Sequence, residues 1–112
     1  MKAEKLEATL GSIRKWQRIV RRTTAVDHGA FNCPLCTLFL ERDCRGCPVS
    51  EATGVSGCRG SPYELWNEHM DECNHHYHRT PGCKECLRLA KAELTFLVGL
   101  LPDKDKKQWS QA

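Results

Sequence analysis

The sequence predicts one small, mainly α-helical domain. Three segments place apolar residues at steps of three and four positions, which is the spacing of a helix that buries one face. No segment shows a convincing alternation of apolar and polar residues, although a short hairpin between Thr37 and Val49 fits the sequence. The 112 residues are enough for one compact domain and too few for two of ordinary size.

The first helix is predicted over residues 4–22, where one apolar stripe follows the helical spacing. The stripe consists of Leu6, Leu10, Ile13, Trp16 or Gln17, and Val20. The second half of this helix carries five cations, which suit the negative end of a helix dipole and are also candidate contacts to phosphates or to a partner. These cations are Arg14, Lys15, Arg18, Arg21 and Arg22.

Helical periodicity disappears over residues 33–60, a cysteine-rich segment that contains five of the eight cysteines. Glycine and proline residues mark repeated turns here, so the segment buries little apolar surface of its own. A small domain with such a segment often needs a metal ion or disulfide bonds for stability.

Two helices are predicted after this segment, over residues 61–72 and 83–101. Ser61 is predicted as the N-cap of the first, with proline at the first helical position and Glu64 as the acid of a capping box. The residues of this helix that are predicted to face inward are Leu65, Trp66 and Met70.

The last helix is predicted from a leucine-rich stripe, and Pro102 ends it. The stripe consists of Leu87, Ala90, Leu94, Leu97 and Leu101. The predicted domain therefore covers residues 1–102, and residues 103–112 are predicted to form a flexible tail.

The chain is expected to be cytoplasmic and to make no membrane contact. Its start is charged where a signal peptide needs an apolar run, and no stretch approaches the roughly 18 apolar residues of a membrane span. Cysteines in a reducing cytosol usually bind metal or act in catalysis. Disulfide bonds are the alternative, because eight thiols could pair in roughly 105 ways.

Three Cys-x2-Cys pairs occur, and two residues between thiolates let a tight turn direct both sulfurs at one ion. The pairs are Cys33/Cys36, Cys44/Cys47 and Cys83/Cys86. Tetrahedral zinc needs two further ligands for each pair it binds, so the pattern predicts a metal-stabilised domain with one or two zinc ions.

The predicted ligands form two groups. The first group is Cys33, Cys36, Cys44 and Cys47, with Cys58 either left over or in place of Cys44. The second group is Cys73, Cys83 and Cys86 with one histidine from His75, His76 and His78, of which we choose His78. An iron–sulfur cluster is the alternative cofactor, because it also takes four cysteine thiolates and because Cys47-Pro48 is a feature of ferredoxin sequences.

The order of cysteine and histidine pairs also resembles that of zinc-stabilised HNH nucleases. In that reading His75-His76 would lie between two zinc-binding pairs. Only six residues separate His76 from Cys83, which is too few for the strand and asparagine of that motif. We therefore expect a protein that is not an enzyme, with an HNH-like nuclease as the remaining catalytic alternative.

A longer string in and after the cysteine-rich segment is more specific than the cysteine spacing. The string is Cys33-Pro34-Leu35-Cys36, Cys44-Arg45-Gly46-Cys47-Pro48, and Cys58-Arg59-Gly60-Ser61-Pro62-Tyr63 with Trp66. It resembles a pattern in small, mostly uncharacterised cysteine-rich proteins of bacteriophages and prophages, over about residues 33–101. The pattern more often has threonine at position 61 and lacks the group from Cys73 to Cys86. The resemblance implies a phage- or prophage-encoded protein that acts in the host cytosol.

Two functions follow from these features. The first is a zinc-binding interaction module, a zinc finger in the broad sense, that binds a host or defence protein. The alternative is a zinc-dependent nucleic-acid-binding regulator that uses the basic helix. The net charge of +3 is small, and no DNA-reading helix signature is recognisable, so we expect a protein partner.

Overall fold

The computed structural model describes residues 1–21, 26–28, 32–39, 44–55, 58–72, 79 and 81–109. Within these ranges the chain forms helices and turns and no strand, which confirms the predicted mainly α-helical class. No helix in the described part of the chain is long and apolar enough to cross a membrane.

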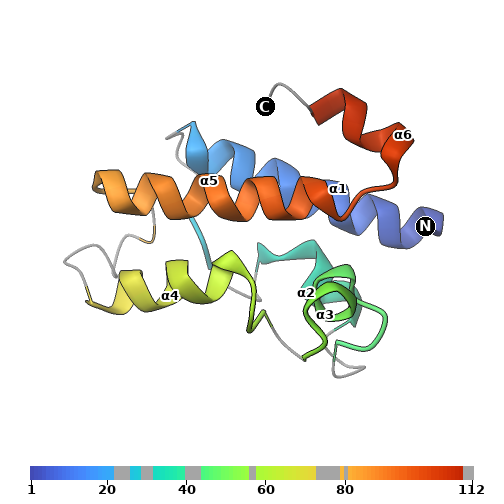
Figure 1. Cartoon of the computed structure of the whole chain (residues 1–112), viewed down its shortest axis with the longest axis horizontal. Helices are drawn as coiled ribbons and strands as arrows, with labels where there is room; N and C mark the ends of the chain where they lie inside the picture. The colour runs from blue at the N-terminus through green and yellow to red at the C-terminus, as the bar shows by residue number, and fades with distance from the viewer. Residues whose placement is uncertain are drawn as a thin grey trace.

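Three longer helices form the frame of the molecule: α1 (Ala3–Val20), α4 (Pro62–Glu72) and α5 (Lys84–Gly99). Helix α5 packs against both α1 and α4, and α1 also packs against the short helix α2 (Pro34–Phe39). Figure 1 shows α5 running in the opposite direction to α1, with α4 along its other side. The cysteine-rich segment contributes α2 and a second short helix, α3 (Pro48–Thr53).

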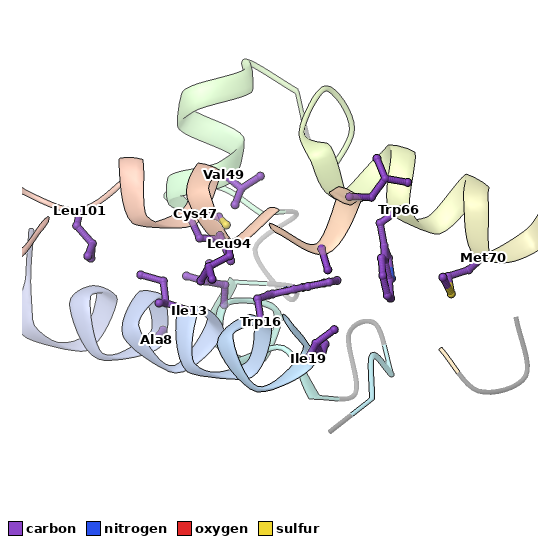
Figure 2. Packing of buried hydrophobic residues seen from close by; sticks show 14 of the residues in the cluster. Ala8, Ile13, Trp16, Ile19, Cys47, Val49, Trp66, Met70, Leu94 and Leu101 are labelled. Carbon is purple, nitrogen blue, oxygen red and sulfur yellow. The ribbon is translucent and has the colours of Figure 1, made fainter. Parts of the chain in front are cut away.

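The core lies between α1, α4 and α5 and is centred on Trp16. The Trp16 ring meets Trp66 edge-to-face at 5.2 Å between centroids and Tyr63 at 5.8 Å. In Figure 2, Ile13 lies near Leu94 of α5, and the Trp16 ring extends toward Trp66. These contacts confirm that the α1 stripe faces the core.

The inward face of α4 is partly as predicted. Trp66 and Met70 have no exposed surface, as expected, whereas Leu65 is 54% exposed. The prediction for Leu65 is wrong because positions 66 and 70, one helical turn apart, already define the buried face.

Helix α4 begins at Pro62 as predicted, but its capping interactions differ from a capping box. The Ser61 hydroxyl donates to the Cys58 carbonyl at 2.6 Å, and the Ser61 amide donates to the same oxygen at 3.3 Å. Because that amide is occupied, Glu64 instead accepts from the amide of Gly60 at 2.8 Å. Gly60 has a φ of 80°, a left-handed conformation that glycine adopts at low cost.

Two predicted segments have a different structure. The hairpin between Thr37 and Val49 is replaced, in its described part, by α2 and α3, each of which begins at a proline. Proline suits the first position of a helix, where the missing amide has no intrahelical partner. The predicted flexible tail is helical over Asp103–Lys106 (α6) and Lys107–Trp109 (η3), and Trp109 packs against the core.

A buried aspartate joins elements that are distant in the sequence. Asp27 has no exposed surface, and its carboxylate accepts from Lys15 Nζ at 2.8 Å on one oxygen. Its other oxygen accepts from the Tyr63 hydroxyl at 2.9 Å, Trp66 Nε1 at 3.0 Å and an Arg79 guanidinium nitrogen at 2.6 Å. The Asp27 cluster, meaning these five residues, therefore links α1 and α4 to the connection that precedes α5.

Candidate metal centres

Three side chains converge where α4 approaches the start of α5, and we call them the C-terminal site: His69, Cys83 and Cys86. Their candidate ligand atoms all lie within 4.8 Å of one another. His69 Nε2 is 3.4 Å from the Cys83 sulfur, and the two sulfurs are 3.3 Å apart. These separations suit a single tetrahedral ion with bonds of about 2.3 Å to sulfur and about 2.0 Å to nitrogen.

The start of α5 explains the chemistry of this cysteine pair. Cys83 is the N-cap residue, and its sulfur accepts from the Cys86 amide at 3.4 Å. That backbone hydrogen bond, followed by the hydrogen bond from His69, lowers the pKa of Cys83 to about 6. Burial raises the pKa of Cys86 to about 11. The lowered pKa of Cys83 is consistent with the predicted stabilisation of a thiolate at the start of this helix.

Sequence reasoning missed His69. The sequence-based prediction takes the histidine from His75, His76 and His78 and favours His78. His69 lies on α4, and a signal for it was present: it is four positions before Cys73, a spacing that puts two ligands on one helix face. Cys73 and His78 lie outside the described residues, so their assignment as ligands stays a prediction.

The structure brings together the other five predicted cysteines around one cavity of about 150 Å³. The five-cysteine pocket is lined by Cys33, Cys36, Cys44, Cys47 and Cys58. Residues of α1 and α5, among them Ser12 and Glu93, complete its wall. Cys58 is therefore part of the same group as the predicted quartet.

A tight turn positions Cys44 and Cys47 at this pocket. The Cys47 amide donates to the Cys44 carbonyl at 3.1 Å, and the Cys44 amide donates to the Phe39 carbonyl at 3.0 Å. Cys44 and Gly46 both have left-handed φ values, of 65° and 85°. The φ of Gly46 favours glycine, and a Cβ at this position would also lie close to the Phe39 ring, at 3.3 Å.

The pocket thiols are electrostatically unequal. A hydrogen bond from the Cys36 thiol lowers the pKa of Cys33 to about 6, and the same hydrogen bond raises the pKa of Cys36. Burial raises the pKa of Cys58 to about 12 and also raises that of Cys47. The Ser12 hydroxyl, 3.8 Å from the Cys33 sulfur, also contributes to the lowered pKa of Cys33.

The predicted basic surface on α1 is smaller than expected. Arg14, Arg18 and Arg21 are exposed at steps of four and three, so they share one helix face. Lys15 is only 6% exposed and pairs with Asp27, so it does not belong to this exposed face. Arg22 lies outside the described residues.

No protein-family model, curated protein or solved structure matches this chain. The resemblance to phage and prophage proteins is accordingly a prediction from the residues alone. The same holds for the cytoplasmic location.

Proposed function

We propose that the protein is a zinc-binding interaction module in which the C-terminal site holds one ion. The observation that carries this proposal is the convergence of one imidazole nitrogen and two sulfurs within 4.8 Å. Thiolate and imidazole ligands favour zinc over magnesium or calcium, which prefer oxygen ligands. The ion would tie the second half of α4 to the first turn of α5.

A structural role fits this ligand set better than a catalytic one. Structural zinc sites use four protein ligands, whereas catalytic sites keep one position open for water or substrate. Cys73 is the sequence-predicted fourth ligand, and with it the site would be a closed Cys3His set. A closed site stabilises a fold and leaves no position for a reacting group.

A protein partner has a candidate surface on the outer face of α4. Leu65 is 54% exposed, and Glu68 and Glu72 are exposed at the following steps of three and four. An apolar side chain followed by acidic ones on the same helix fits a partner surface with an apolar contact beside basic side chains. In a phage- or prophage-encoded protein that partner would be a host or defence factor.

Replacing His69 tests the metal ligand directly. The His69→Ala variant, purified without added metal, is expected to lose about one metal equivalent per chain by elemental analysis, since an incomplete shell binds weakly. His28→Ala changes an exposed histidine far along the chain and should keep the full content. Full metal content in His69→Ala, with loss in His78→Ala, would restore the sequence-based choice and contradict ours.

The nucleic-acid alternative is supported by the arginine face of α1, and salt dependence separates it from the protein-binding function. Three phosphate contacts predict a log–log slope of affinity against salt of about −2.7, from about −0.9 per phosphate. We expect only weak duplex binding in gel-shift titrations, because Lys15 is buried and the total charge is small.

The controls for this titration use the same chain. Arg18→Glu with Arg21→Glu should remove whatever binding exists, whereas Lys91→Glu, an exposed cation on α5, should change it little. Tight binding with the full slope, abolished only by the α1 changes, would replace the protein-binding proposal with the regulator.

A further inference from the structure

The five-cysteine pocket is separate from the C-terminal site and is assembled from three parts of the chain. Cys33 and Cys36 come from the start of α2, Cys44 and Cys47 from the turn before α3, and Cys58 from the turn before α4. Packing alone does not explain five thiols around one cavity, because cysteine packs equally well when it is dispersed through a core. This gathering requires a chemical explanation.

A second observation at the same cavity also indicates a ligand. Glu93 of α5 is 3% exposed and lines the cavity, yet its Oε1 atom has no hydrogen-bond partner. A buried polar atom without a partner is costly and usually marks an unfilled function or a missing partner. An apolar packing defect would explain neither this carboxyl group nor the five thiols around it.

Three of the five cysteines are the best candidates for metal ligands. Cys33, Cys36 and Cys58 line both the main cavity and a smaller, adjoining one of about 60 Å³ that reaches Glu93 and Lys15. Cys44 and Cys47 line the main cavity only. Since tetrahedral thiolate sites need four ligands, one of these two supplies the fourth.

We infer that the five-cysteine pocket is a second metal centre, ligated by thiolates alone, with Cys33, Cys36 and Cys58 among its ligands. The soft sulfur donors select zinc or an iron–sulfur cluster over oxygen-seeking cations. This centre is independent of the zinc proposed at the C-terminal site, with which it shares no ligand.

The spacing of the sulfurs bears on which of these two centres is bound. Two sulfurs on one zinc lie within about 4.6 Å of each other, twice the zinc–sulfur bond length. Among the described residues only His69, Cys83 and Cys86 form a group of three ligand atoms within 4.8 Å, so no three pocket sulfurs are that close. A cluster binds its thiolates to different iron atoms and fits this wider spacing, whereas zinc requires the sulfurs to draw together.

The test counts zinc, iron and acid-labile sulfide per chain in protein purified without oxygen and without added metal. His69→Ala is expected to keep the pocket metal while losing the zinc of the C-terminal site. Cys36→Ser and Cys58→Ser should lose the pocket metal and keep the zinc of the C-terminal site. Thr37→Ser, a conservative change next to Cys36, should keep both metals. Glu93→Gln should also keep both, because the unpaired Glu93 oxygen is proposed to contact a ligand sulfur and not the metal itself, and a glutamine amide can make the same contact.

Spectroscopy keeps the inference testable if the cysteine variants fail to fold. X-ray absorption of the metal retained by His69→Ala should show sulfur neighbours only. Zinc with four sulfurs supports a mononuclear centre, and iron with sulfide supports a cluster. Retention of all metal in both cysteine variants, loss of the pocket metal in Glu93→Gln, or no metal in His69→Ala would overturn the inference.

Discussion

Removing the metal with a strong chelator is expected to unfold residues 33–60 and to separate α4 from the start of α5. Structural zinc typically contributes about 10–16 kcal/mol at neutral pH, which is comparable to or larger than the whole stability of a small domain, about 5–15 kcal/mol. Far-UV circular dichroism should lose helical signal, and the thermal midpoint should fall sharply.

The loss should begin in the cysteine-rich segment. Its helices α2 and α3 have six residues each, far below the length at which a helix is stable alone, and both line a cavity that leaves part of their contact with α5 unfilled. Helices α1 and α5 are longer and share a large apolar contact, so they should keep more amide protection in hydrogen exchange. Restoring metal should restore the signal; unchanged dichroism and midpoint, with metal removal verified, would contradict the prediction.

Asp27→Ala is expected to lower the free energy of unfolding by about 3–5 kcal/mol, the cost of leaving a buried charge without its partner. The change leaves the buried Lys15, which is 6% exposed, without its ion-pair partner, and it removes the hydrogen-bond acceptor of Tyr63 and Trp66. Burial, followed by the charge of Asp27, raises the pKa of Tyr63, so this phenol stays protonated and donates. Urea unfolding of the variant measures the difference.

Two further variants isolate the reason for this loss. Asp71→Ala removes an exposed carboxylate near the end of α4 and should change stability by no more than about 0.5 kcal/mol. Combining Asp27→Leu with Lys15→Met removes both charges and should recover part of the stability. A loss below about 1 kcal/mol in Asp27→Ala would show that the cluster contributes little.

The sequence predicted the three long helices well because their burial follows one local period. The apolar spacing marks positions that the structure buries, among them Ile13, Trp16, Trp66 and Leu94. Prolines mark the first residue of α4 and the chain just after α5. Lys15 shows the limit of this reasoning. Its partner Asp27 lies twelve positions away, and the sequence contains no periodic signal for a contact of that kind.

The sequence predicted that cysteine pairs bind metal, but it predicted only some of the residues that the structure brings together at each site. Spacing within each Cys-x2-Cys pair is local, so the pairs were found; which pairs and histidines share one ion depends on packing between helices. His69 reaches Cys83 because α4 and α5 pack together, a contact between residues 14 positions apart. Glu93 gave no signal in the sequence because an acidic residue in a leucine-rich helix ordinarily faces solvent.

The Asp27 cluster also affects how tightly the C-terminal site can hold its ion. Arg79 is fixed at both ends: its guanidinium and Nε bind Asp27, and its carbonyl accepts from the Asp27 amide at 3.0 Å. The chain between His69 and Cys83 is therefore anchored four positions before Cys83. Closing the four positions from this anchor to Cys83 costs about 1 kcal/mol less in loop-closure entropy than closing the 14 positions from His69. The Asp27 cluster and the proposed ion thus act on the same stretch of chain, one at Arg79 and the other at Cys83, and each lowers the entropic cost of forming the other.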